Sequence, residues 1–180
     1  MVIWVTGISG AGKTTLCHAL APLLRPHVSG VVLLDGDVIR EVFGGDLGYR
    51  ESDRMIQVRR IQAFARLVSA QGVTVIAAVL YAHPELLAWN RRHLPDYFEV
   101  YLKAPLELVQ RRDVKGIYRK ATQGLMADVV GLDIPWHEPV APDLVIDATQ
   151  ELPPELLARQ VVMAIPAFAD LLSAQAVRHD

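Results

Sequence analysis

Short apolar runs alternate along the chain with longer segments in which apolar residues recur every three or four positions. Apolar runs of this length predict strands buried on both faces of a sheet, at 2–6, 31–34, 73–80, 97–102 and 143–147. The other segments predict helices at 13–24, 52–70 and 84–93, from Pro105, and from 153 until Pro166 interrupts. Because strands alternate with helices, we expect an α/β fold with a parallel five-stranded sheet and helices on both faces.

The first predicted strand leads directly into a glycine-rich stretch and a helical pattern. The stretch reads Gly7-Ile8-Ser9-Gly10-Ala11-Gly12-Lys13-Thr14-Thr15 and predicts a phosphate-binding P-loop. Glycines allow successive backbone N–H groups to point at one anion, and the following helix directs its positive end to the same place. Lys13 is expected to reach the β- and γ-phosphates, and the Thr14 hydroxyl to hold Mg²⁺. The predicted ATP contacts are Gly7, Ser9, Gly10, Ala11, Gly12, Lys13, Thr14 and Thr15.

Composition narrows the possible classes of protein. The 180 residues fit one domain, 1–180, and no apolar run is long enough to span a bilayer. The only cysteine, Cys17, is expected to be a small buried group, which favours a reducing cytoplasm. Met1 stands almost directly before a core strand, so no targeting peptide is expected. A net charge of −2 without a basic stripe gives no indication of nucleic acid or a membrane as partner.

Two aspartates follow the second predicted strand. Asp35 and Asp37 flank Gly36, and we expect this strand to lie beside the strand of the P-loop. One carboxylate suits Mg²⁺ beside Thr14, and the other suits an attacking hydroxyl that must be oriented or deprotonated. The residues alone leave open which aspartate has which role. The alternative is an exposed acidic turn.

Basic residues gather in two further places. Arg40 and Arg54 are candidates to clamp an anionic acceptor, because guanidinium groups suit phosphate and sulfate. The stretch 111–120 holds five basic groups and begins a predicted lid, 111–135, that closes over the phosphates. A solvated basic helix is the alternative for this stretch.

Several of these motifs together resemble the adenylylsulfate kinase family. The most specific are Leu34-Asp35-Gly36-Asp37-Val38-Ile39-Arg40 and Arg112-Asp113-Val114-Lys115-Gly116-Ile117-Tyr118. The resemblance implies a P-loop kinase that uses Mg-ATP to phosphorylate the ribose 3′-hydroxyl of adenosine 5′-phosphosulfate (APS), commonly as a homodimer.

The resemblance also implies roles for individual residues. Asp37, Lys13 and Lys115 are the expected catalytic residues, Thr14 and Asp35 the metal ligands, and Arg112 a further ATP contact. The expected contacts to the acceptor are Asp35, Arg40, Tyr49, Arg54, Gln57, Lys115 and Val130.

The departures from the family pattern fall in the acceptor half. Gln57 replaces an asparagine, and Tyr81-Ala82-His83 replaces Ser-Pro-Tyr, so no phosphoserine intermediate is expected. Val129-Val130-Gly131 replaces Phe-Thr-Gly, which removes an aromatic surface for a base.

These departures resemble a divergent branch associated with surface-polysaccharide genes, in which a cytidine diphosphoramidate is phosphorylated. Two acceptors therefore stay open, APS and a cytidine diphosphate derivative, and so do the roles of His83, Trp89 and Trp136. A nucleotide-dependent switch without an acceptor is the alternative from another class.

Overall fold

The computed structural model describes residues 1–169 and has an all-parallel sheet at its centre. The five strands are β1 (Val2–Thr6), β2 (Val31–Asp35), β3 (Thr74–Val79), β4 (Tyr97–Lys103) and β5 (Leu144–Asp147). The helices are α1 (Lys13–Leu24), α2 (Gly36–Val42), α3 (Glu51–Ser69), α4 (Pro84–His93), α5 (Leu106–Arg112), α6 (Ile117–Thr122), the 3₁₀ helix η1 (Ala148–Gln150) and α7 (Pro154–Ala164). The predicted α/β architecture is confirmed, and the single-domain prediction for 1–180 extends beyond the described residues at 170–180.

The strand order corrects one expectation. The order is β2-β3-β1-β4-β5, so β3 lies between β2 and the strand of the P-loop. Both edges of β1 are taken, by β3 on one side and β4 on the other. The first crossover therefore skips one strand position, which the apolar pattern of a single strand cannot reveal. Asp35 and Asp37 consequently approach the P-loop across the end of β3.

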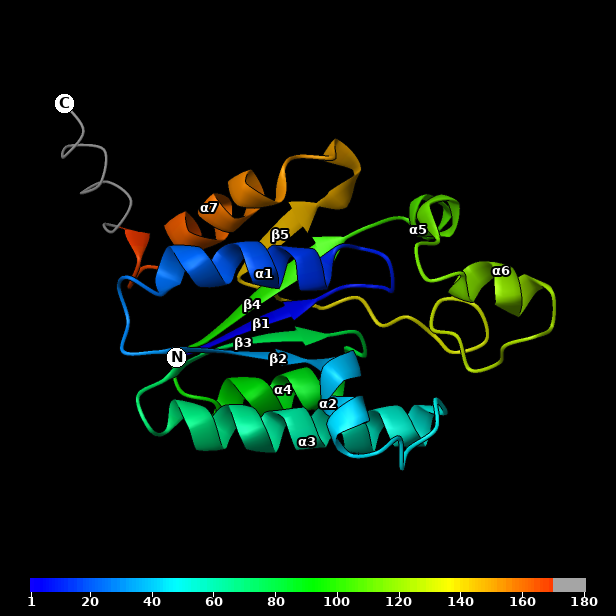
Figure 1. The fold of residues 1–180 in the computed structure, drawn as a ribbon, viewed down its shortest axis with the longest axis horizontal. Coiled ribbons are helices and arrows are strands. Elements are labelled where there is room, and N and C mark those ends of the chain that lie inside the picture. The colour runs from blue at the N-terminus through cyan, green and yellow to red at the C-terminus, as the bar shows by residue number, and fades with distance from the viewer. Residues whose placement is uncertain (170–180) are drawn as a thin grey trace.

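Helices cover both faces of the sheet (Figure 1). The helices α1 and α7 pack together on one face, where Leu16, Leu20 and Val161 are buried. On the other face α3 and α4 pack on the sheet through residues such as Ile61, Ala65 and Leu86. No helix within residues 1–169 is long and apolar enough to cross a membrane.

A segment after β4 projects beyond the carboxyl ends of the strands (Figure 1). It comprises α5, α6 and the chain that returns from Gln123 towards β5. Pro105 caps α5 and does not occupy its first turn, one position earlier than expected. Because ligands of parallel sheets bind outside the carboxyl ends of the strands, this segment is placed to cover a ligand there.

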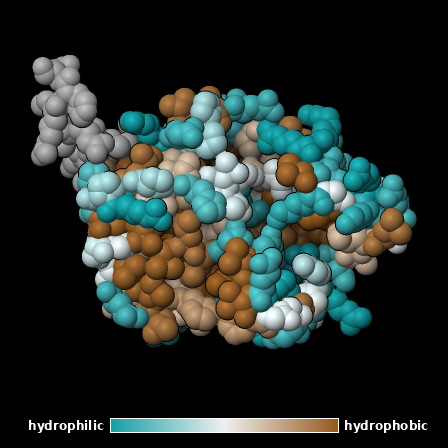
Figure 2. Space-filling view, in the orientation of Figure 1, coloured by the Kyte–Doolittle hydropathy of each residue, from teal (hydrophilic) through white to brown (hydrophobic). Residues whose placement is uncertain are grey.

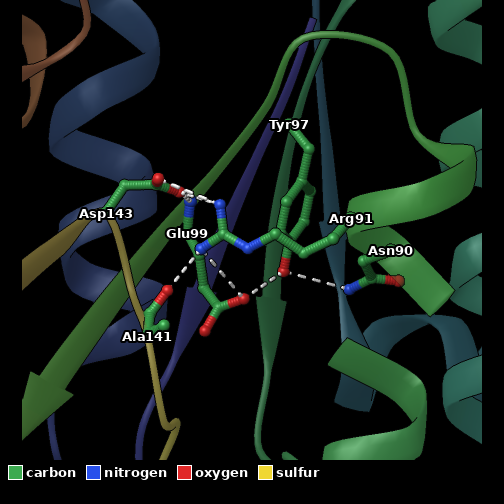
Figure 3. Close-up of polar contacts among 6 residues, drawn as sticks. All are labelled: Asn90, Arg91, Tyr97, Glu99, Ala141 and Asp143. Atoms are coloured by element: carbon green, nitrogen blue, oxygen red, sulfur yellow. Dashed lines mark hydrogen bonds and ion pairs between the residues drawn. The ribbon is translucent and has the colours of Figure 1, made fainter. Parts of the chain in front are cut away.

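At the opposite end of the sheet, a polar network holds the start of β5 (Figure 3). The Arg91 guanidinium on α4 donates to both carboxylate oxygens of Asp143, at 2.9 and 2.8 Å, and to the carbonyl of Ala141 at 2.7 Å. The same guanidinium lies 3.7 Å from Glu99, which is 2% exposed and accepts from the Tyr97 hydroxyl at 2.8 Å. These bonds fasten the returning chain far from the predicted site.

The surface over the edge strand β2 is largely apolar. Figure 2 shows a broad apolar area where Figure 1 places β2 and the adjoining side of α3. Val31, Val32 and Leu33 of β2 are only half-buried, and Val42 on α2 and Leu67 on α3 are exposed. An apolar area beside an unpaired strand edge is typical of surfaces that contact other proteins.

Candidate functional site

A cavity of about 580 Å³ opens at the carboxyl ends of the strands. Segments distant in sequence meet around it: the P-loop, the start of α2, the first turns of α3, the end of β3 and the projecting segment. The predicted site residues that line it are Ser9, Gly10, Gly12, Lys13, Thr14, Thr15, Asp35, Asp37, Arg40, Tyr49, Arg54, Gln57, Lys115 and Val130. The structure thus brings most of the predicted donor and acceptor contacts into one cavity.

The P-loop has the backbone that its glycines predict. Gly10 and Gly12 have φ of 82° and 100°, in the left-handed region that side chains disfavour. Gly7 lies against β4 so closely that a Cβ there would come within 2.7 Å of the Leu102 carbonyl oxygen. The loop therefore tolerates no side chain at the point where it leaves β1, and it stays curled around an open centre.

Lys13 begins α1 and points its amine back over the loop. Its Nζ donates to the carbonyl of Ile8 at 3.1 Å. Burial among protein atoms lowers the pKa of Lys13 to about 8, although Asp37 acts in the opposite direction. An anion in the loop favours the charged amine, so phosphate and Lys13 would stabilise each other.

Asp35 is held by two hydrogen bonds that use different oxygens. Its Oδ1 accepts from the backbone N–H of Asp37 at 2.8 Å and caps α2. Its Oδ2 accepts from the Thr14 hydroxyl at 2.6 Å. A hydroxyl and a carboxylate side by side are hard oxygen donors, and Mg²⁺ typically takes one or two of these together with substrate phosphates. The donor set therefore fits a magnesium ion.

Asp37 forms an ion pair with Lys115, which reaches it from the projecting segment. Both side chains are exposed to the cavity, and Asp37 raises the pKa of Lys115. Lys115 lies between α5 and α6, just after Asp113, whose carboxylate accepts the backbone N–H groups of Tyr118 and Arg119 at 3.1 and 2.9 Å. The turn that presents Lys115 is thereby fixed by its own side chains.

Two arginines and a tyrosine form the acceptor side of the cavity. The Arg40 and Arg54 guanidinium carbons lie 4.8 and 5.6 Å from the centre of the Tyr49 ring. Arg40 donates to the carbonyls of Leu47 and Gly48 at 2.9 and 2.7 Å. These contacts to neutral groups leave two positive charges directed at one compartment, as the anion clamp predicted from sequence requires.

Gln57 and Val130 complete this compartment. Gln57 Nε2 donates to the Gly36 carbonyl at 3.0 Å, whereas its Oε1 is buried without a hydrogen-bond partner in residues 1–169. A buried, unpaired acceptor of this kind is costly unless a ligand satisfies it. Val130 is buried and, with Val129, supplies aliphatic surface.

Three predicted site residues, and the three residues whose roles stayed open, do not line the cavity. Gly7 and Ala11 are internal to the loop, and Arg112 donates to the Ala148 carbonyl and to Glu151 on the side of β5. His83 caps α4 by accepting the N–H of Glu85 at 3.3 Å. Trp89 stacks on His93, and Trp136 packs near Tyr101. The expected ATP contact of Arg112 stays a prediction.

Several residues in the site received no role from the sequence. Tyr118 donates its hydroxyl to the carbonyl of Ser9 at 3.1 Å and so ties α6 to the P-loop. The Asp128 carbonyl accepts from Arg54 at 2.7 Å, and Asp133 holds the amides of Asp128 and Val129. Tyr118 lies within the Arg-Asp-Val-Lys-Gly-Ile-Tyr motif, but nothing local indicated that the Asp128 carbonyl would contact Arg54 on α3.

Comparison with known proteins gives one consistent family. The family model described as Adenylylsulphate kinase matches residues 1–147. The adenylyl-sulfate kinase of Synechococcus sp. (strain JA-2-3B'a(2-13)) is 38% identical over 157 residues, 87% of this chain and 90% of that protein. The adenylyl-sulfate kinase of Chloroflexus aurantiacus is 42% identical over 144 residues, 80% of this chain and 77% of that protein.

A solved structure gives the same result. The APS kinase CysC of Mycobacterium tuberculosis, in complex with AMPPNP and APS, superposes with a TM-score of 0.82 at 31% identity. The match covers 91% of this chain and 95% of that one.

Proposed function

Because the chain belongs to the adenylylsulphate kinase family, a family of nucleotide kinases that use ATP, we propose that it transfers the γ-phosphoryl group of ATP to the 3′-hydroxyl of APS. One observation carries this proposal for the chain's own residues. The cavity joins a phosphate loop with Thr14 and Asp35 at one end to two guanidinium groups at the other, and Asp37 also lines it. A donor phosphate, an attacking hydroxyl and an anionic tail thus each find a matching group.

The donor phosphates are bound by the P-loop. Its amides and the Lys13 amine surround the β- and γ-phosphates, and this arrangement favours the charged form of Lys13. Thr14 and Asp35 would hold Mg²⁺, which, when bound, neutralises charge on the phosphates. The hydrogen bond from the Asp37 amide to Asp35 Oδ1 fixes the orientation of the Asp35 carboxylate. The position of this metal ligand relative to the backbone of Asp37 is therefore fixed as well.

The acceptor hydroxyl is activated by Asp37. Its carboxylate accepts the proton as the ribose 3′-oxygen forms a bond to the γ-phosphorus and the bond to the ADP oxygen breaks. Lys115 exchanges its pairing with Asp37 for the transferring phosphoryl oxygens, where a positive charge stabilises the transition state. The ion pair between Asp37 and Lys115 accordingly keeps both groups ready at the same point.

The far end of the acceptor is recognised by charge and by one amide. Arg40 and Arg54 face the sulfate and phosphate, and the exposed Tyr49 ring near both of them stacks on a base. The unpaired Oε1 of Gln57 accepts a hydrogen bond from the acceptor. An uncharged sugar would leave two guanidinium groups unpaired and is disfavoured.

A cytidine diphosphate derivative is the second candidate acceptor. Val129 and Val130 present aliphatic side chains and no aromatic face at this point of the cavity. Their presence favours the cytidine derivative, because its smaller base needs less enclosing surface than adenine. A coupled assay of ADP release with APS and with cytidine diphosphoramidate, in parallel, separates the two. We expect turnover with APS; turnover with the cytidine compound alone would overturn this choice of acceptor, and ATP hydrolysis without any acceptor would favour a switch.

A homodimer is also proposed. The apolar area over β2, with half-buried Val31, Val32 and Leu33, supports it. Sedimentation velocity measures the mass directly, and a monomer at micromolar concentration would contradict the dimer.

A further inference from the structure

Two residues of opposite charge lie one turn apart on α3 but do not pair. Glu51 and Arg54 stand at positions i and i+3, where side chains of a helix are neighbours and opposite charges usually meet. Among residues 1–169, however, no carboxylate lies within 4.0 Å of the Arg54 guanidinium. The side chains are separated because each has a different set of partners.

The hydrogen bonds of Arg54 go to neutral groups only. It donates to the carbonyls of Tyr49 and Asp128 at 2.8 and 2.7 Å. Burial, and then the charge of Arg40, lower the pKa of Arg54, yet a guanidinium stays protonated. The charge of Asp128 opposes this shift, but its carboxylate lies beyond 4.0 Å of the guanidinium. A partly desolvated charge without a directly paired carboxylate attracts an anion strongly, since water screens it less. The acceptor compartment that Arg54 lines is where such an anion would enter.

Glu51 is held by groups at the end of β3 and in the returning chain. The Tyr81 hydroxyl donates to Glu51 Oε1, and His137 Nε2 lies 4.0 Å from the same oxygen. Tyr81 is 3% exposed, and burial together with Glu51 raises the pKa of its hydroxyl, so it remains a donor at neutral pH. Stacking with His83 and edge contact with His137 restrict the ring further.

We propose that Tyr81 is a positioning residue which retains the Glu51 carboxylate and thereby keeps the Arg54 guanidinium available to the anionic end of the acceptor. The inference rests on the proposed function for the identity of that acceptor. Tyr81 lines the cavity, and its hydroxyl is bonded to Glu51 and not to Arg54. Its role is to prevent an internal salt bridge that would neutralise the binding site.

The consequence of losing the hydroxyl follows directly. In Tyr81→Phe the Glu51 carboxylate loses its strongest donor and is free to turn one helical turn towards Arg54. A charge-assisted pair there competes with the acceptor, so the KM for APS rises by about tenfold or more. The kcat at saturating APS and the KM for ATP stay close to wild type, because the P-loop, Asp37 and Lys115 are unchanged.

The test is a double-mutant cycle in the full-length chain with APS as the acceptor. The variants are Tyr81→Phe, Glu51→Gln and the double variant Tyr81→Phe/Glu51→Gln. Because glutamine carries no charge to neutralise Arg54, the double variant is expected to recover a KM within about threefold of wild type. Tyr97→Phe is the matched control, since this buried hydroxyl also donates to a glutamate but lies at the opposite end of the sheet.

The outcomes separate this inference from the proposed function. Failure of the wild-type protein to phosphorylate APS would refute the acceptor, whereas an active wild type with an unchanged KM in Tyr81→Phe would refute the role of Tyr81. A Tyr81→Phe defect that Glu51→Gln does not rescue would indicate a lost packing contact and overturn the proposal. A crystal structure of Tyr81→Phe decides independently of turnover: we expect Glu51 within 4 Å of Arg54, and an unmoved carboxylate would overturn it.

Discussion

The hydroxyl of Thr14 donates a 2.6 Å hydrogen bond to the carboxylate of Asp35 across the end of an intervening strand. Thr14 belongs to the first turn of α1, and Asp35 is the last residue of β2, which pairs with β3 and not with β1. Two donors for a hard cation therefore meet although their strands are not neighbours. Much of the proposed chemistry depends on this junction between the P-loop and the second strand.

The first prediction concerns the metal. In Asp35→Asn a neutral amide replaces the carboxylate beside Thr14, so the free Mg²⁺ concentration for half-maximal rate rises by about tenfold or more. The measurement is the initial rate against free Mg²⁺ at saturating ATP and APS. Asp46→Asn, which loses only an ion pair with Arg60, is the control and is expected to keep the wild-type requirement. Equal magnesium dependence in both variants would argue against Asp35 as a ligand.

The second prediction concerns the base. Asp37→Asn keeps the shape of the side chain but cannot accept the ribose proton, so kcat falls by about a hundredfold to ten-thousandfold. ATP binding, measured by calorimetry, stays near wild type because Asp37 is not part of the P-loop. If the variant turned over at near the wild-type rate, Asp37 would not be the base.

The third prediction concerns the projecting segment. Lys115→Ala removes the cation that pairs with Asp37, and we expect kcat to fall by about a hundredfold. Lys120→Ala is the matched control, because Lys120 lies on α6 of the same segment but does not line the cavity. Stopped-flow or steady-state rates with APS measure both variants. Equal losses in the two would mean that general loosening of the segment, and not the charge at 115, limits the reaction.

The fourth prediction concerns stability and pH at the opposite end of the sheet. Burial raises the pKa of Glu99, although Tyr97 and Arg91 oppose the shift and Asp143 adds to it. The folded protein thus favours protonated Glu99, and the stability that this proton contributes is lost as pH rises through the folded-state pKa. Glu99→Gln, which stays neutral, should therefore gain in melting temperature relative to wild type as the pH is raised from 4.5.

Thermal unfolding at several pH values measures this effect. Glu155→Gln, an exposed change on α7, is the control and should follow the wild-type profile. A difference between Glu99→Gln and wild type that stays constant with pH would show that the carboxyl is equally protonated in the folded and unfolded chains.

The sequence by itself determined the donor site. The P-loop is contiguous, so its glycines, Lys13 and Thr14 define a local shape that needs no distant partner. The same holds for the alternating strands and helices, because periodicity is a local property. Asp37 and Lys115 were also predicted as catalytic residues, since each stands in a short motif that resembles those of one family, and their roles stay predictions.

Only the tertiary structure decided how these pieces meet. In the sheet, β3 lies between β1 and β2. This order depends on which strands pair in the folded protein, and the composition of a single strand does not reveal it. The tertiary structure also decided that Glu51 pairs with Tyr81 and leaves Arg54 without a directly paired carboxylate among residues 1–169, although helix spacing alone would join Glu51 to Arg54. Contacts between residues thirty or more positions apart depend on packing that no local pattern encodes. On the acceptor side of the cavity, the bond from Arg54 to the Asp128 carbonyl and the bond from Tyr81 to Glu51 are such contacts.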